Sequence, residues 1–133
     1  MFELTMNGNV YEFNFGMGFL REINRTVSIP VDGTPGIKDN VGLRYAVSKL
    51  FEGDAETLEN VLDIANKGQA KRLTKSAIDA YLEDESTDID EVFTVVMGFL
   101  KEANVTKKTT MKVLEDIQKE LDRRKRIAEM EGN

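Results

Sequence analysis

The sequence predicts an α+β domain that is mainly α-helical, with an N-terminal β-hairpin followed by about six helices, the last one long and able to project. Three observations support this class. Apolar residues alternate over 2–15 around an Asn7-Gly8 pair, which favours a tight type I′ turn. From Gly16 onward, apolar residues recur every three or four positions. The 41% hydrophobic content and the net charge of −6 indicate one charged domain with a modest core.

Side chains that can cap helices mark where most of the helical stretches begin. Asp39, Asp54, Thr74 and Asp88 can each accept hydrogen bonds from the free N–H groups of a first turn, so each is predicted to be an N-cap. The expected helices cover residues 16–27, 39–52, 54–67, 75–82, 88–102 and 106–130.

The segment 28–38 separates the first two predicted helices. It contains both prolines of the chain, Pro30 and Pro35, together with two glycines. These residues favour turns and interrupt regular structure. We therefore predict an extended surface loop.

Two of the helices have distinct expected roles in the core. The helix 88–102 is the most hydrophobic in the chain and is expected at the centre of the core, with Gly98 as a point of close packing. The helix 39–52 is predicted to bury one apolar stripe. That stripe consists of Leu43, Val47, Leu50 and Phe51.

The last helix carries the candidate partner-binding residues. Its apolar stripe recurs at three and four residues and then ends, so the same side chains could pack within the domain or against another chain. The candidate binding residues are Met111, Leu114, Ile117, Leu121 and Ile127. We expect residues 1–104 to form the hairpin-and-helices domain, and residues 105–133 to form a C-terminal helix and tail that packs on this domain or extends from it.

Beyond the stripe, the last helix is strongly charged. Arg123–Arg126 form a basic run, and the pairs Glu120 with Arg124 and Asp122 with Arg126 are expected to support the helix. This run, with Lys107 and Lys108, suggests an alternative function, a small nucleic-acid-binding regulator. The net negative charge and the absence of interleaved aromatic residues argue against that alternative.

Composition excludes most catalytic and metal-binding constellations. The chain has no Cys and no His, so thiolate nucleophiles, imidazole bases and the usual zinc ligands are missing. A calcium loop beginning at Asp84 would need Gly at Ile89 and Glu at Val95. Carboxylate pairs are present, Asp88 with Asp90 and Glu59 with Asp63, but solvated helix faces account for them better than a hydrolytic cleft. We predict no catalytic residues, no metal and no cofactor.

The expected location is the cytoplasm. The first residues lack the basic region and apolar run of a secretion signal, and no stretch approaches the ~20 apolar residues that cross a bilayer. No membrane partner is expected.

Two parts of the sequence carry a family resemblance. The first is Met1-Phe2-Glu3-Leu4-Thr5-Met6-Asn7-Gly8, continued by Tyr11-Glu12-Phe13-Asn14-Phe15-Gly16 and Gly18-Phe19-Leu20-Arg21-Glu22-Ile23-Asn24. The second is Gly42-Leu43-Arg44-Tyr45-Ala46, followed after further helices by Gly98-Phe99-Leu100-Lys101-Glu102. Together they resemble the tail assembly chaperones of long-tailed, siphovirus-type bacteriophages and Gram-positive prophages, over residues 1 to about 104.

The resemblance implies a non-enzymatic protein of virion morphogenesis. Members of this family bind the tape measure protein, keep it soluble, help recruit tail tube subunits and are absent from the mature virion. Self-association is also expected. The family offers no chemical site to carry over, so the stripe on the last helix is inferred from its spacing alone.

Overall fold

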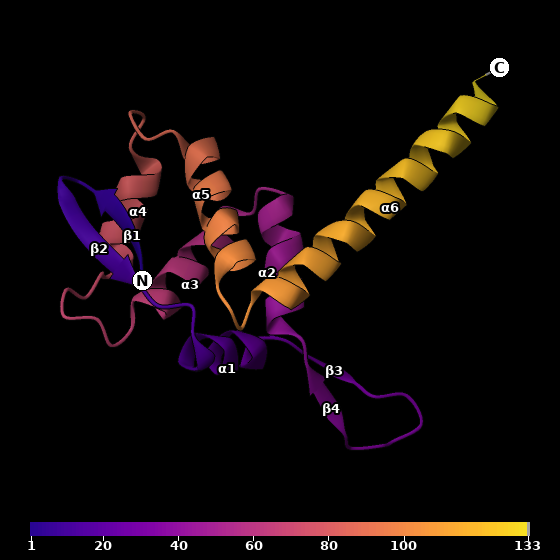
Figure 1. The fold of residues 1–133 in the computed structure, drawn as a ribbon, viewed down its shortest axis with the longest axis horizontal. Helices are drawn as coiled ribbons and strands as arrows, with labels where there is room; N and C mark the ends of the chain where they lie inside the picture. The colour runs from indigo at the N-terminus through magenta and orange to yellow at the C-terminus, as the bar shows by residue number, and fades with distance from the viewer. Residues whose placement is uncertain (133) are drawn as a thin grey trace.

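The computed structural model describes residues 1–132 and begins with the predicted hairpin, followed by six α-helices (Figure 1). The strands are β1 (Phe2–Met6), β2 (Asn9–Phe13), β3 (Ser28–Pro30) and β4 (Lys38–Asn40). The helices are α1 (Met17–Arg25), α2 (Gly42–Phe51), α3 (Ala55–Asn66), α4 (Lys75–Glu83), α5 (Ile89–Glu102) and α6 (Lys107–Glu131). The predicted α+β class, mainly helical with a long last helix, is confirmed.

The N-terminal hairpin forms as its turn residues predict. β1 and β2 are antiparallel, with Phe2 opposite Phe13 and Met6 opposite Asn9. Asn7 and Gly8 have φ angles of 51° and 78°, the left-handed values that a type I′ turn requires at both central positions. Because side chains alternate between faces, Met6 and Phe13 end up fully buried while their neighbours face solvent.

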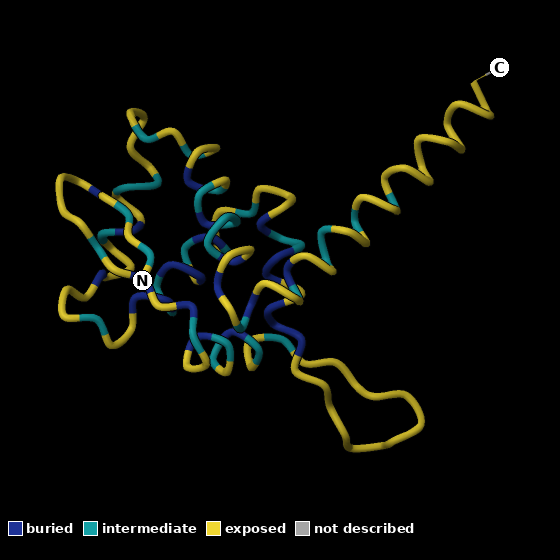
Figure 2. The backbone as a smooth tube through the Cα atoms, viewed as in Figure 1, coloured by how far each residue is buried: buried dark blue, intermediate teal, exposed yellow. Residues whose placement is uncertain are grey.

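The segment 28–38 differs from the prediction in one respect. It is exposed and extended, as expected, but its ends pair as β3 and β4, with Ser28 opposite Asn40 and Pro30 opposite Lys38. Residues 28–40 therefore form a narrow two-stranded ribbon that stands away from the body (Figure 2). Proline can occupy such a strand because neither strand of the ribbon has a second neighbour.

The predicted cap at Asp39 is wrong because that residue belongs to β4. Helix α2 begins three residues later, at Gly42, and its first turn is capped from α1: the side-chain oxygen of Asn24 accepts a hydrogen bond from the Leu43 N–H at 2.9 Å. Gly42 allows this close approach of α1 and α2. A Cβ at that position would lie 1.7 Å from the carbonyl oxygen of Ile23.

The other three predicted caps are confirmed. The side chains of Asp54, Thr74 and Asp88 each accept a hydrogen bond from the backbone N–H three residues later, at 3.1, 3.1 and 3.2 Å. Each satisfies one of the N–H groups that a helix leaves free at its start. These caps fix the starts of α3, α4 and α5.

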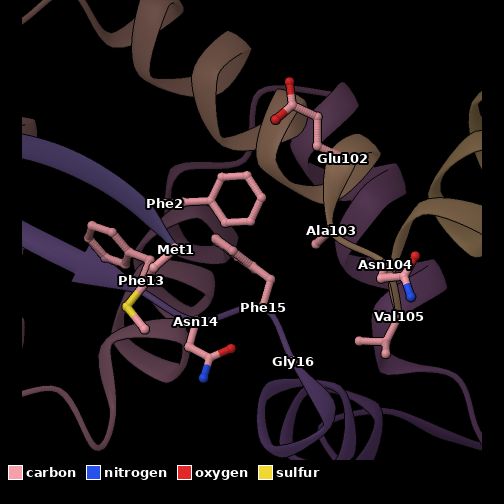
Figure 3. Close-up of a pocket in the computed structure, with 10 residues that line it drawn as sticks. All are labelled: Met1, Phe2, Phe13, Asn14, Phe15, Gly16, Glu102, Ala103, Asn104 and Val105. Atoms are coloured by element: carbon pink, nitrogen blue, oxygen red, sulfur yellow. The ribbon is translucent and has the colours of Figure 1, made fainter.

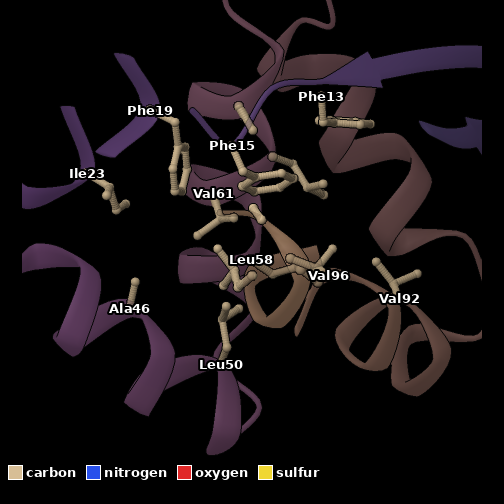
Figure 4. Close-up of a cluster of buried hydrophobic side chains, with 14 of the residues drawn as sticks. Phe13, Phe15, Phe19, Ile23, Ala46, Leu50, Leu58, Val61, Val92 and Val96 are labelled. Carbon is tan, nitrogen blue, oxygen red and sulfur yellow. The ribbon is translucent and has the colours of Figure 1, made fainter. Parts of the chain in front are cut away.

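The core lies where the hairpin meets α1, α2, α3 and α5 (Figure 4). α5 contributes Val92, Val96 and Leu100, all buried, which agrees with its expected central place. Gly98 does not make the predicted close contact, because a Cβ built on it would meet no atom within 4 Å. It lies on the side of α5 away from the buried row.

A buried amide joins the hairpin to the helices. The side-chain nitrogen of Asn66 donates hydrogen bonds to the carbonyl oxygens of Glu12, at 2.9 Å, and Lys71, at 3.2 Å. Its oxygen accepts from the Leu73 N–H and from Arg72. Asn66 is completely buried, so these bonds replace those that water would otherwise supply.

The two halves of α6 have different surroundings. The first half packs on α2 and α5, where Thr110 is buried and Val113 and Leu114 lie against the core. From Leu121 to the end of the described chain, every residue is exposed. The 25 residues of α6 span about 37 Å, and its later part extends from the body as a single helix (Figure 1). We call residues 121–131 the outer arm.

Candidate partner-binding surface

Most of the exposed large apolar side chains belong to three elements, the ribbon, α2 and α6. Twelve large hydrophobic residues are exposed among residues 1–132, and nine of them belong to the ribbon, α2 or α6. These nine are Ile29, Val31, Ile37, Tyr45, Phe51, Met111, Leu121, Ile127 and Met130. Contiguous exposed apolar surface marks sites that contact other molecules, so the places where these residues adjoin one another are the candidates.

The structure divides the predicted stripe on α6 between the core and solvent. Leu114 and Ile117 are half-buried, and Leu114 packs against the core. Met111, Leu121 and Ile127 are 52%, 42% and 40% exposed. Leu114 and Ile117 therefore lie toward the body, whereas Met111, Leu121 and Ile127 are open to solvent.

A groove lies where the stripe leaves the body. Ser48, Phe51 and Glu52 of α2 form one wall, and Ile117, Glu120, Leu121 and Arg124 of α6 form the other. We call this the α2–α6 groove; its volume is about 340 Å³. Phe51, Ile117 and Leu121 give the groove an apolar lining, and Glu52, Glu120 and Arg124 add charged side chains to it.

The prediction that Phe51 is buried is wrong. It was predicted to complete the buried stripe of α2, but it is 51% exposed and lines the groove. The buried row of α2 consists of Leu43, Ala46, Val47 and Leu50. Phe51 is the last residue of the helix and lies a further 100° around its axis, which turns it from the core toward α6.

Charges at the edge of the groove are neutralised within α6. Glu120 accepts hydrogen bonds from Arg123, at 2.6 and 3.0 Å, and from Arg124, at 3.1 Å. These bonds, first that from Arg123, lower the pKa of Glu120 to about 2. The predicted pair of Glu120 with Arg124 is confirmed. Asp122 instead accepts a hydrogen bond from Gln118.

A second hollow lies on another side of the molecule, between the hairpin and the turn that joins α5 to α6 (Figure 3). Its volume is about 410 Å³, and Phe2, Phe13 and Phe15 are among its lining residues. Phe2 and Phe15 also contact the ring of Phe99, with centroids 4.8 and 5.8 Å away. These rings support one another as part of the core edge, and none of the predicted binding residues lies here.

The carboxylates considered as catalytic pairs have structural partners. Asp88 caps α5, and Asp63 forms an ion pair with Arg72 at 2.8 Å. Glu59 pairs across helices with Asp79, and this hydrogen bond raises the pKa of Glu59. Within residues 1–132, no three acidic side chains converge as a metal site would require.

Asp84, the first residue of the rejected calcium loop, also has a local role. Its carboxylate accepts hydrogen bonds from the backbone N–H and the hydroxyl of Ser86, and these bonds lower the pKa of Asp84. It stabilises the turn before α5.

None of the helices in the described chain is long and apolar enough to span a bilayer.

The features that distinguish this fold are the long helix α6 and the partly apolar α2–α6 groove. Residues 3–115 match the family model described as "Phage tail assembly chaperone protein, TAC". This match covers most of the chain, and the protein belongs to that family. Its role is therefore in phage tail assembly, with partners among the components of that process. No curated protein and no solved structure matches the chain.

The extent of the match is informative about α6. It includes Met111 and Leu114, but it ends before Ile117, Leu121 and Ile127. The family model therefore describes the body and the packed start of α6. The outer arm lies beyond it.

Proposed function

We propose that this protein is a non-enzymatic chaperone that binds an amphipathic helical segment of the tape measure protein and helps tail tube subunits assemble around it. The observation that carries the proposal is the exposed apolar row of the α2–α6 groove and the outer arm in a member of the tail assembly chaperone family. We further propose that it acts in the cytoplasm of the host bacterium and is not part of the mature virion.

The groove suits an amphipathic helix in shape and chemistry. Phe51, Ile117 and Leu121 offer an apolar floor between two helices, where side chains spaced three and four residues apart on a third helix could insert. Glu52 and Arg124 at the edges remain in water while the apolar faces join. The net charge of −6 helps such a complex stay in solution.

Binding to nucleic acid has less support than binding to protein. Two of the four residues in the basic run, Arg123 and Arg124, already form ion pairs with Glu120. A phosphate backbone would have to compete with that carboxylate. The exposed apolar row would remain uncovered in such a complex.

Co-expression with the tape measure protein from the same phage genome tests the proposal. The wild-type chain should keep the tape measure protein in the soluble fraction and copurify with it. The variant Leu121→Gln with Ile127→Gln should lose most of this effect, because it makes the outer arm polar. The matched control, Val10→Gln with Met17→Gln, changes two residues that are equally exposed, at 50% each, but lie on the hairpin and α1.

The control variant should behave like the wild-type chain. If both variants keep the tape measure protein soluble, another surface binds it and the proposed site is wrong. If the wild-type chain itself leaves that protein insoluble, the proposed partner is wrong.

A further inference from the structure

The register of the hairpin decides which backbone groups of β1 point away from β2. Its two-residue turn is closed by a hydrogen-bonded pair, Met6 with Asn9. Hydrogen-bonded and non-hydrogen-bonded pairs alternate along antiparallel strands, so Thr5 and Glu3 belong to the non-hydrogen-bonded pairs. Their N–H and C=O groups therefore point to the outer edge of β1.

The outer edges of the two strands have different surroundings. At β2, the carbonyl oxygen of Glu12 accepts a hydrogen bond from the buried side chain of Asn66, at 2.9 Å. Just past the strand, the Asn14 N–H donates to the carbonyl oxygen of Ala65 at 2.8 Å. These bonds agree with the alternation and cover the β2 edge with the end of α3. At β1, no further strand of the described chain pairs with the outer edge.

β1 also lacks the features that commonly protect a free edge, which are proline, lysine and bulges. The ribbon has such protection: Pro30 lies at an outward-facing position, because the next residue, Val31, donates to the Ile37 carbonyl oxygen at 3.0 Å. β1 contains neither proline nor lysine, and its register with β2 is unbroken. The outward groups of Glu3 and Thr5 are therefore available to a third strand.

The side chains of the hairpin indicate the chemistry of such a strand. Glu3 lies directly opposite Glu12 on the exposed face, and like charges in this position destabilise a sheet. A Lys or Arg beside Glu3 would offset the repulsion. On the other face, Phe2 and Leu4 pack against the core but are only half-buried. Apolar residues on both sides of the cation would cover them.

The hollow between the hairpin and the α5–α6 turn lies at the Phe2 end of this edge (Figure 3). Met1 and Phe2 are among its lining residues, so a strand that runs beside β1 toward Phe2 would end at the hollow. Its volume of about 410 Å³ can accept an aromatic side chain. When a peptide adds to a sheet edge, backbone hydrogen bonds supply affinity, and pockets for side chains supply specificity.

We propose that β1 accepts an extended segment of a partner protein as a third strand. The segment lies antiparallel to β1, the more stable direction, with a Lys or Arg beside Glu3, apolar residues beside Leu4 and Phe2, and an aromatic residue in the hollow. The inference rests on the hairpin and does not depend on the occupant of the α2–α6 groove, which shares no residue with this edge. A chaperone with both sites could hold a helical and an extended partner at once.

A peptide titration tests the proposal. The probe is the acetylated and amidated heptapeptide Val-Thr-Val-Lys-Val-Thr-Phe, whose Lys falls beside Glu3 when its first Thr lies beside Thr5. In NMR spectra of the wild-type chain, the amides of Glu3 and Thr5 should exchange rapidly and become protected as the peptide binds, with a Kd below about 1 mM. Methylating the backbone nitrogens of the Lys and the first Thr should weaken binding about tenfold, because these N–H groups pair with β1.

Two proline variants distinguish the edges of the hairpin. Thr5→Pro removes an outward N–H of β1 without removing a hydrogen bond to β2. Val10→Pro makes the same change at the β2 edge and is the matched control, because Val10 lies directly opposite Thr5. Thr5→Pro should weaken peptide binding at least about fivefold, and Val10→Pro should leave it unchanged. Both variants should retain the circular dichroism spectrum of the wild-type chain.

A charge exchange tests the contact with Glu3 without changing the backbone. Glu3→Lys should weaken binding of the probe at least about threefold, and should strengthen binding of the same peptide with Glu in place of Lys by a similar factor. No binding at about 2 mM peptide, protection that omits Glu3 and Thr5, or equal losses in the two proline variants would overturn the proposal. Protection of Glu3 and Thr5 before peptide is added would also overturn it, since a second copy would then occupy the edge.

Discussion

Replacing Leu114 by Gln should destabilise the protein much more than replacing Leu121 by Gln. The two leucines are seven residues apart and lie on the same side of α6, but Leu114 packs against the core while Leu121 belongs to the outer arm. Gln resembles Leu in length and in helix propensity. The difference between the two variants therefore reports packing against the body.

The size of the difference follows from burial. Complete burial of a leucine side chain contributes about 1.5 to 3 kcal/mol. Leu114 is half-buried, so its replacement should lower the free energy of unfolding by about 1 to 2 kcal/mol, or roughly 3 to 8 °C in Tm for a chain of this length. Leu121 is 42% exposed and is not part of the core, so its replacement should cost less than about 0.5 kcal/mol.

Urea unfolding followed by far-ultraviolet circular dichroism measures both values, since the chain has no Trp for fluorescence. A concentration of about 5 μM keeps self-association from contributing to the measured stability. Equal losses for the two variants, or a larger loss for Leu121→Gln, would refute the reasoning. Such a result would mean that the outer arm packs on the body instead of projecting.

Three further predictions concern the body. Gly42→Ala should lower the free energy of unfolding by more than about 3 kcal/mol in a urea titration, because its Cβ would lie 1.7 Å from the Ile23 carbonyl oxygen. Asn66→Ala should cost about 3 kcal/mol in the same assay, since it leaves buried backbone groups without partners; a loss below about 1 kcal/mol would contradict this. Glu59→Gln should raise Tm at pH 7 by roughly 1 to 3 °C. The hydrogen bond with Asp79 raises the pKa of Glu59 in the folded protein above its usual value of 4.5. The wild-type pair is therefore stabilising below pH 4.5, and this stabilisation is lost as the pH rises through the higher folded pKa. The advantage of Gln should accordingly disappear in melts below pH 4.5.

Local signals in the sequence account for the parts of the fold that were predicted correctly. Asn7-Gly8 defines its turn because few other residue pairs adopt left-handed angles at two successive positions. Asp54, Thr74 and Asp88 cap helices through atoms only three residues away. Such interactions require no knowledge of the tertiary structure.

The errors involve contacts between distant segments. Asp39 resembled a cap, but its backbone pairs with Ile29, and the helix that it was expected to start is capped by Asn24 of another helix. Asn66 carries no recognisable signal in the sequence, although its side chain binds β2 and the loop before α4 at once. No spacing within either segment reveals these partners.

The candidate site was predicted only in part, because its remaining residues also depend on contacts between distant segments. Helical spacing identifies the stripe from Met111 to Leu121, but spacing cannot say where a helix leaves the body. That point depends on the length of α2, which ends at Phe51 and leaves the rest of α6 uncovered. The exposed ring of Phe51, and with it the groove, follows from the way α2 and α6 pack.

Amide hydrogen exchange of the protein, alone and bound to the tape measure protein, tests most directly whether the outer arm is the working surface. For the dilute chain alone, the amides of residues 121–131 should exchange much faster than those of α3 and α5, because every residue of this arm is exposed, whereas α3 and α5 contribute buried residues to the core. In the complex, the largest slowing should occur over residues 117–131 and around Phe51. Unchanged exchange in both places, with slowing confined to the hairpin or the ribbon, would contradict the account.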